Sequence, residues 1–145
     1  MSDTQYSTVE QAARYLTTGE FDALSDLFQY PFAFYYEDEF KVIPDKAGMM
    51  EAMKHYRREL HESGVVRVDA KVIECDMTMP NCHRCKVHWL YYNRDNTIAA
   101  ASEHELFLRL SAIDSEYKIE LMDVRASSNQ AFRKFMGMNN AEPKN

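Results

Sequence analysis

The stretch from Cys82 to Val124, CHRCKVHWLYYNRDNTIAAASEHELFLRLSAIDSEYKIELMDV, decides the fold of this chain. Apolar and polar residues alternate in three successive parts of it, residues 82–92, 97–110 and 117–124, and such alternation is typical of half-buried strands. The RDNT tetrapeptide between the first two parts is typical of a two-residue hairpin turn. We therefore predict three consecutive antiparallel strands.

Cross-strand pairs support one register for the first two strands. On an apolar face, the predicted pairs are Val87 with His104, Trp89 with Ser102 and Tyr91 with Ala100. On the opposite face, they are Lys86 with Glu105 and His88 with Glu103. A slip of one residue would destroy both the apolar pairs and the charge pairs, so the register is well specified.

The third strand brings a candidate catalytic pair into this sheet. If Leu110 pairs with Tyr117, His104 lies opposite Asp123 on the mainly apolar face. A carboxylate beside a histidine fixes its tautomer and raises its basicity, as acid–base catalysis requires. The alternative is a polar pair whose two members simply satisfy each other near the edge of the sheet.

The segments before these strands predict helices and one hairpin. Helices are expected from a capping box at Ser7–Glu10 up to Gly19, from Glu20 to Phe28, and from Lys46 to Ser63 with Asp45 as N-cap. Strands are expected at 32–36, 40–43 and 65–75, and a short helical turn at 131–136. The predicted order is α-α-β-β-α-β-β-β-β, an α+β fold with a curved antiparallel sheet wrapped on helices. One domain spans 1–145, with its core at about 7–125 and a tail at 126–145.

Three segments carry a family resemblance. RYLTTGEFDALSDLF (14–28) and EHELFLRL with EYKIELMDV (103–110, 116–124) resemble the first two helices and the last two strands of the nuclear transport factor 2-like superfamily, which includes ketosteroid isomerases, scytalone dehydratase and polyketide cyclases. The resemblance implies a cone whose concave sheet face holds a pocket, and a dimer through the outer face. It does not imply an activity, because the enzymes of this group use different residues.

The same resemblance suggests further site residues. Tyr15 lies at about the place of the tyrosine that helps to form the oxyanion hole of ketosteroid isomerases. For the base of those enzymes, Tyr36, Glu37 and Asp38 are all candidates. The isomerase activity itself is not carried over.

Composition excludes several classes of function. The net charge of −6 argues against general nucleic-acid binding and against anionic membrane surfaces. No run of 18 apolar residues exists, so no membrane span is expected. Three cysteines and the absence of a signal-peptide pattern predict free thiols and a cytoplasmic location.

The cysteines do not predict a metal site. Cys82 and Cys85 are three residues apart on a strand, where their side chains point to opposite faces, whereas a metal needs convergent ligands. Cys75 and His83 complete the set without adding a second Cys-x-x-Cys. We expect no metal and no cofactor.

Aromatic residues and methionines predict an apolar pocket for a small, partly apolar molecule. The candidate ligand-binding residues are Tyr36, Tyr56, Trp89, Tyr91, Met53 and Val87. The alternative is that most of them are core residues. On the outer sheet face, a homodimer interface is expected at Leu90, Tyr92, Ala101 and Phe107.

The prediction for function is therefore a small-molecule-binding domain with an aromatic internal pocket. The alternative is a cofactor-independent isomerase, dehydratase or cyclase. In that case His104 would act as base or acid, Asp123 would orient it, and Tyr15 or Tyr36 would stabilise an oxyanion.

Overall fold

A computed structural model describes residues 4–37 and 39–135. Its helices are α1 (Thr4–Thr18), α2 (Phe21–Ser25), α3 (Lys46–Glu62) and α4 (Gln130–Phe135). Its strands are β1 (Phe28–Tyr36), β2 (Glu39–Ile43), β3 (Val65–Met79), β4 (Cys82–Asn93), β5 (Ile98–Leu110) and β6 (Tyr117–Ser127). The predicted α+β class and element order are confirmed. The turn expected at 131–136 corresponds to α4, and Met136 lies outside the described residues.

Within the described residues, the strands form a six-stranded sheet in the order β2-β1-β6-β5-β4-β3. The sheet is mixed, because β1 runs parallel to β6 while the other neighbours are antiparallel. The prediction of a wholly antiparallel sheet is therefore wrong for this one pair. Parallel neighbours need a long connection, and here the whole segment from β2 to β5 supplies it.

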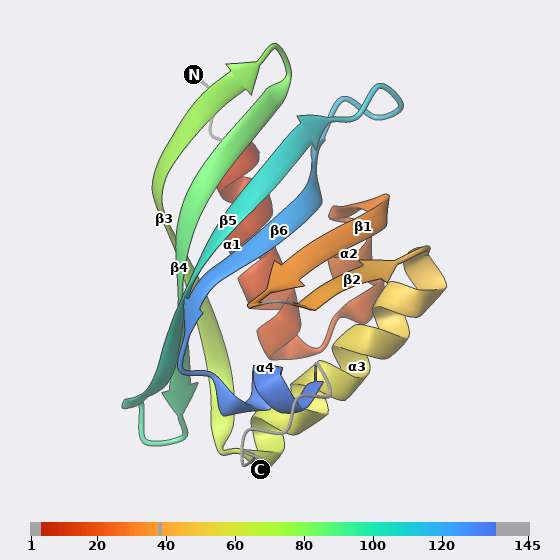
Figure 1. The fold of residues 1–145 in the computed structure, drawn as a ribbon. Helices are drawn as coiled ribbons and strands as arrows, with labels where there is room; N and C mark the ends of the chain where they lie inside the picture. Colours follow the sequence, from red (N-terminus) through yellow and green to blue (C-terminus); the bar gives the residue numbers. More distant parts are fainter. Residues whose placement is uncertain (1–3, 38, 136–145) are drawn as a thin grey trace.

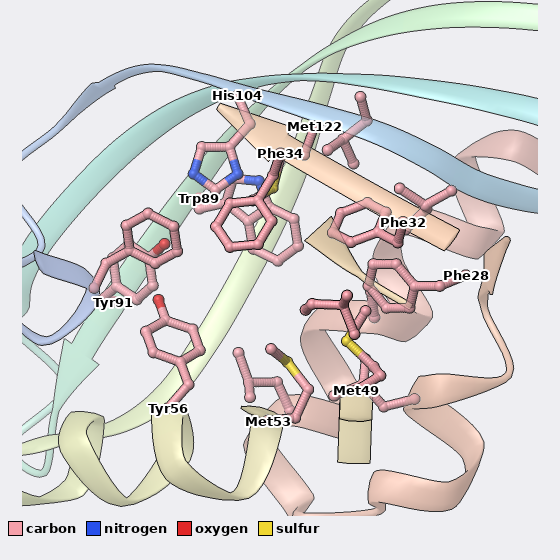
Figure 2. A pocket seen from close by; sticks show the side chains of 17 residues that line it. Phe28, Phe32, Phe34, Met49, Met53, Tyr56, Trp89, Tyr91, His104 and Met122 are labelled. Carbon is pink, nitrogen blue, oxygen red and sulfur yellow. The ribbon is translucent and has the colours of Figure 1, made fainter. Parts of the chain in front are cut away.

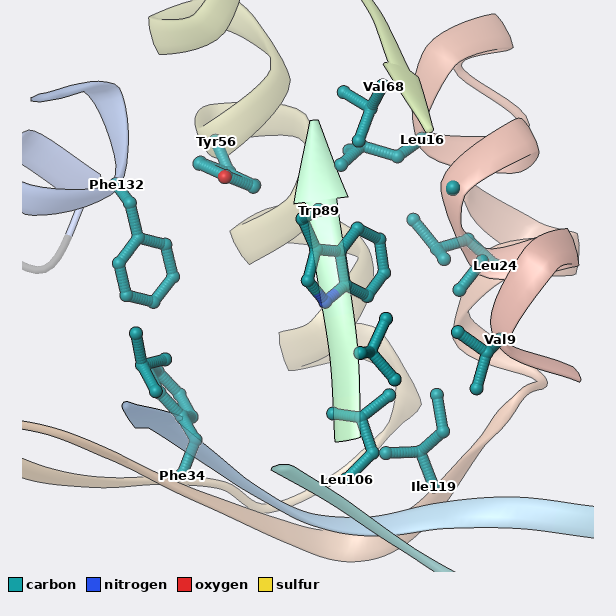
Figure 3. Close-up of a cluster of buried hydrophobic side chains, with 14 of the residues drawn as sticks. Val9, Leu16, Leu24, Phe34, Tyr56, Val68, Trp89, Leu106, Ile119 and Phe132 are labelled. Carbon is teal, nitrogen blue, oxygen red and sulfur yellow. The ribbon is translucent and has the colours of Figure 1, made fainter. Parts of the chain in front are cut away.

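The helices cover one face of the curved sheet (Figure 1). Bulges in β3 at Ile73 and near both of its ends add curvature, since an unpaired extra residue bends a strand. Figure 3 shows the core that results, with Val9, Leu16 and Leu24 from the helices facing Trp89 and Leu106 from the sheet. The sheet and helices thus form the two layers around one core.

Helix ends differ from the prediction where local signals are weak. The predicted N-cap Ser7 lies inside α1, so the capping box is not used. At α3 the prediction is confirmed, since the Asp45 side chain accepts a hydrogen bond of 2.8 Å from Gly48 N. Gly19 follows α1 with a φ of 82°, which favours glycine. The predicted second helix is shorter, because β1 already begins at Phe28.

The register of β4 and β5 is confirmed at all five predicted pairs. Their turn is not the predicted two-residue loop. Asn93 N donates to Thr97 O at 2.8 Å and Asn96 N donates to Asn93 O at 2.9 Å, with Asn96 at a φ of 71°. This is a three-residue loop ending in a left-handed residue, and a bulge at Ala99 restores the register.

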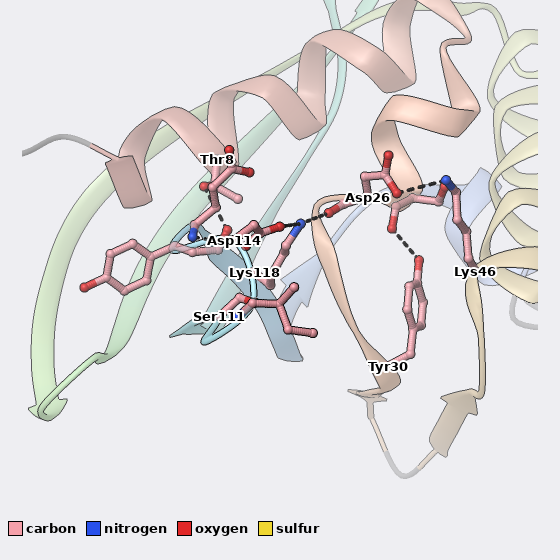
Figure 4. A network of polar contacts seen from close by, with 11 residues as sticks. Thr8, Asp26, Tyr30, Lys46, Ser111, Asp114 and Lys118 are labelled. Atoms are coloured by element: carbon pink, nitrogen blue, oxygen red, sulfur yellow. Dashed lines mark hydrogen bonds and ion pairs between the residues drawn. The ribbon is translucent and has the colours of Figure 1, made fainter.

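Ion pairs and hydrogen bonds tie the α2–β1 junction to neighbouring elements, and we call them the surface network (Figure 4). Lys46 Nζ lies 2.9 Å from an Asp26 carboxylate oxygen, and Lys118 Nζ donates to Asp26 O at 2.6 Å and lies 3.2 Å from an Asp114 oxygen. Tyr30 Oη donates to Ser25 O at 2.6 Å. The network holds the loop before β6 against α2.

In the described part of the chain, no helix has the length and apolar character needed to cross a membrane.

Candidate functional site

A bulge in β6 separates the two residues of the predicted catalytic pair. The predicted pairing of Leu110 with Tyr117 is confirmed, but the partners shift between Phe107 and Leu108, with Glu120 as the extra residue. His104 therefore pairs with Val124, and Asp123 pairs with Glu105.

Asp123 is engaged elsewhere. One of its carboxylate oxygens accepts a hydrogen bond of 2.7 Å from Arg125 Nη1. The prediction of a His104–Asp123 dyad is therefore wrong. Its physical reason is the one-residue slip, which turns Asp123 to the opposite face of the sheet from His104.

A cavity of about 80 Å³ lies between the helices and the concave face of the sheet. Five predicted site residues line it together: Met53, Tyr56, Trp89, Tyr91 and His104. Figure 2 shows the polar-tipped residues Tyr56, Tyr91 and His104 gathered toward one end, and Phe28, Phe32 and Met49 toward the other. The cavity thus has an apolar end and a polar end.

The volume of the cavity is small for a ligand-binding pocket. Ligand pockets commonly measure roughly 300–1,000 Å³, so the space suits a molecule of about one ring or less. Met49 and Met53 line it from α3. Because methionine side chains are unbranched and adaptable, rearranging them would enlarge the cavity without moving the backbone.

Side chains at the polar end form a continuous chain of hydrogen bonds. Asn129 Nδ2 donates to Tyr56 Oη at 2.7 Å, and the Tyr56 and Tyr91 hydroxyls are hydrogen-bonded to each other. Tyr91 Oη lies 2.9 Å from Ser102 Oγ, which lies 3.1 Å from His104 Nε2. All five residues are buried. We call this series of contacts the buried chain.

Burial controls the protonation states along this chain. Desolvation lowers the pKa of His104 to about 3, so its imidazole is neutral at neutral pH. Desolvation likewise raises the pKa of Tyr56 and Tyr91, so both phenols keep their protons. The chain therefore consists of neutral groups.

Two nitrogen atoms at the polar end have no hydrogen-bond partner among the described residues. They are Trp89 Nε1 and His104 Nδ1. The two rings lie 5.4 Å apart between centroids, and both line the cavity. Buried polar groups are normally paired, so these two atoms are the chemical feature of the site that calls for an explanation.

The other predicted site residues that the structure describes do not line the cavity. Tyr15 is partly buried on α1 against the core. Tyr36 is buried, and its hydroxyl accepts a hydrogen bond of 3.1 Å from Arg133 Nη1. Val87 is fully buried in the packed core. Glu37 pairs with Arg133 at 2.8 Å, and Asp38 lies outside the described residues.

The prediction of three free thiols is wrong, because Cys75 and Cys85 form a disulfide. These residues lie directly opposite each other on β3 and β4. The prediction ended the earlier strand at Cys75, whereas β3 continues to Met79 and brings the two cysteines into register. Cys82 is a buried free cysteine.

Sequence reasoning missed two polar residues of the site. Ser102 had a usable signal, because the correct register already placed it opposite Trp89 on the apolar face. Asn129 had a partial signal: an asparagine directly before the helical segment QAFRKF is a good N-cap, and its side chain does accept from Phe132 N at 3.2 Å. Its contact with Tyr56, 73 residues away, had no local signal.

Comparisons with known proteins agree with this fold. A family model described as "NTF2-like protein (DUF6841)" matches residues 5–122. A search of curated proteins found no significant match.

Solved structures with low sequence identity share the fold. An NTF2-like protein with a cystatin-like fold from Novosphingobium aromaticivorans matches with a TM-score of 0.65 at 10% identity, covering 92% of this chain and 87% of that one. ActVI-ORFA from Streptomyces coelicolor matches with a TM-score of 0.63 at 12% identity, covering 87% and 93%.

A third solved structure contains a small molecule. It is a protein from Catenulispora acidiphila in complex with S-DNPA, with a TM-score of 0.61 at 12% identity, covering 83% of this chain and 90% of that one. At such identities the likeness extends to the fold alone.

Proposed function

This chain belongs to the family of NTF2-like proteins (DUF6841), and we propose that it binds a small, partly apolar molecule in its internal cavity. The observation that carries the proposal is the cavity itself, with aromatic and aliphatic walls and the polar-tipped residues Tyr56, Tyr91 and His104 gathered toward one end (Figure 2). Apolar walls with a few convergent polar groups are the usual composition of small-molecule sites. The ligand complex of the Catenulispora protein supports the idea by analogy.

Trp89 is a built-in reporter for this proposal. It is the single tryptophan of the chain, and it lines the cavity. Titration with one-ring aromatic compounds should therefore change the tryptophan fluorescence in a saturable way. No saturable change with any compound of this size, by fluorescence or by calorimetry, would contradict the proposal.

A variant that fills the cavity sharpens the test. Ala12 lines the cavity from α1, so Ala12→Leu adds three carbon atoms to a space of about 80 Å³. We expect at least a tenfold loss of affinity, on the order of 1.4 kcal/mol. The control is Arg14→Leu, which introduces the same side chain at an exposed position of the same helix and should bind normally.

We also propose that the outer sheet face forms a homodimer interface. Leu90, Tyr92 and Phe107 are only half-buried there, and Ala101 is exposed. An apolar patch of this kind favours contact with its own copy. Light scattering after size exclusion should give twice the chain mass, and Leu90→Glu should give the monomer. A monomeric wild-type protein at high micromolar concentration would exclude the dimer.

A cytoplasmic location stays a prediction, and its argument from free thiols no longer applies to Cys75 and Cys85. Disulfides persist in oxidising compartments. Alkylation of thiols in intact cells, followed by mass spectrometry, distinguishes the two cases. Free Cys75 and Cys85 would support the cytoplasm, and a disulfide would support an oxidising compartment.

A further inference from the structure

We infer that the cavity selects ligands carrying a hydrogen-bond acceptor oxygen, such as an aromatic ketone, because both unpartnered nitrogens at its polar end are N–H donors. The inference rests on the proposed function and adds the chemical class of the ligand. Trp89 Nε1 is a donor by its chemistry. The tautomer of His104 decides the role of the second nitrogen.

A backbone N–H group sets the direction of hydrogen-bond donation along the buried chain. Phe132 N donates to Asn129 Oδ1 at 3.2 Å, and a backbone N–H can only donate. The carbonyl of the Asn129 amide is therefore oriented toward α4. Its Nδ2, which can only donate, is the atom that contacts Tyr56 Oη at 2.7 Å.

Each hydroxyl then donates its proton to the next group along the buried chain. Tyr56 accepts from Asn129 and has one proton, which it gives to the Tyr91 hydroxyl. Tyr91 accepts from Tyr56, so its own proton goes to Ser102 Oγ at 2.9 Å. Ser102 in turn donates to His104 Nε2 at 3.1 Å. In Figure 2 the Tyr56 and Tyr91 hydroxyls point toward each other, as this order requires.

The end of the chain fixes the tautomer of His104. Because Nε2 accepts from Ser102, the single proton of the neutral imidazole is on Nδ1. Nδ1 is buried and has no partner among the described residues, and the same is true of Trp89 Nε1. Two adjacent rings that line the cavity therefore carry buried N–H donors with no acceptor among the described residues.

Two unpaired donors favour one class of ligand. A carbonyl oxygen has two lone pairs and can accept from both nitrogens, while its aromatic ring occupies the space among the phenylalanines and methionines. A ligand without an acceptor would leave both donors unpaired. A cation would meet donors only, so the site disfavours ammonium groups.

A matched pair of probes tests this selectivity in the complete protein. Acetophenone and ethylbenzene have the same single ring and carbon skeleton and differ by the carbonyl oxygen. Since one or two neutral hydrogen bonds are gained, acetophenone should bind about tenfold or more tightly than ethylbenzene. Equal affinities would overturn the inference and leave the proposed function standing. Binding of neither probe would overturn both.

The tautomer can be measured without any ligand. A long-range 1H–15N correlation spectrum distinguishes an Nδ1–H from an Nε2–H imidazole. We expect Nδ1–H for His104 in the wild-type protein. An Nε2–H tautomer would overturn the inference even if both probes bind.

Asn129→Asp tests whether Asn129 sets the direction of hydrogen-bond donation along the buried chain. A carboxylate still caps α4 but can only accept from Tyr56, so every hydrogen bond of the buried chain should reverse and His104 should become Nε2–H. Burial raises the pKa of such a carboxyl group, so the comparison is made at a pH where the carboxylate is ionised; there the preference for acetophenone over ethylbenzene should fall at least threefold. Gln130→Glu, the same change at the neighbouring exposed position, should alter neither quantity. An unchanged Nδ1–H tautomer in a folded, ionised Asn129→Asp protein would contradict the argument.

Discussion

The buried chain and the surface network are both continuous series of polar contacts, but they differ in surroundings. In the buried chain, neutral groups contact one another beside an apolar cavity. In the surface network, charged groups such as Lys46 and Asp26 contact one another with side chains about half exposed. A polar contact in low dielectric is strong and costly to leave unmade, whereas an exposed ion pair is screened by water and salt. The comparison suggests that the buried chain determines specificity and that the surface network contributes little to stability.

The largest effect is expected from removing the start of the buried chain. Asn129→Ala deletes the cap of α4 and leaves the Tyr56 hydroxyl without its donor, which should cost about 2–4 kcal/mol in the free energy of unfolding. Urea denaturation of this variant beside the exposed-site control Gln130→Ala measures the difference. A loss below about 1 kcal/mol would mean that the chain is not tightly coupled to the fold.

The pH dependence of the free energy of unfolding should also reflect the buried chain. The pKa of His104 is lowered to about 3 in the folded protein, against about 6.5 when unfolded. As the pH falls, the unfolded state therefore takes up a proton on His104 before the folded state does. The contribution of neutral His104 to the free energy of unfolding is present above about pH 6.5 and is lost as the pH falls toward 3. Between about pH 7 and about pH 5 the loss from His104 should be roughly 2 kcal/mol.

His104→Gln isolates this effect from the other histidines. The variant should lose about 2 kcal/mol less than the wild type over the same pH range. Parallel stability profiles for the two proteins would show that His104 is not neutral and buried in solution.

The smallest effect is expected in the surface network. Lys46→Met removes the ion pairs of Lys46 with Asp22 at 3.0 Å and Asp26 at 2.9 Å. The free energy of unfolding should fall by about 0–1 kcal/mol, and the difference should shrink further in high salt. A loss as large as that of Asn129→Ala would erase the distinction between the two networks.

Much of the fold could be predicted from the chain, because its signals are local. The register of β4 and β5 followed from alternation and from facing charges such as Lys86 with Glu105. Asp45, as an N-cap residue, correctly predicted the start of α3. These features depend on neighbouring residues or on one pair of strands, and the periodicity of side chains is enough to read them.

The errors have a common physical cause. A bulge cannot be recognised in the alternation of apolar and polar residues. The sequence therefore did not predict that the extra residue Glu120 would move Asp123 away from His104. The end of β3 was placed four residues early, and this hid the contact of Cys75 with Cys85. Long-range contacts depend on the sum of such small shifts, which one strand pattern does not reveal.

The candidate site was predicted in part for the same reason. Trp89, Tyr91 and His104 lie on the inner face of a strand pair whose register was known. The cavity residues of β1, including Phe28 and Phe32, depend on the parallel pairing of β1 with β6. That pairing has no sequence signal, because the two strands are separated by most of the chain.

The most direct test of the account is the indole N–H signal of Trp89 in a 1H–15N spectrum, since one tryptophan gives one such signal. Titration with acetophenone should shift this proton in the direction of hydrogen-bond formation and reach saturation, while ethylbenzene should cause a smaller shift of different direction. An indole signal that stays in place while acetophenone binds elsewhere, or does not bind at all, would contradict a cavity that holds an acceptor oxygen.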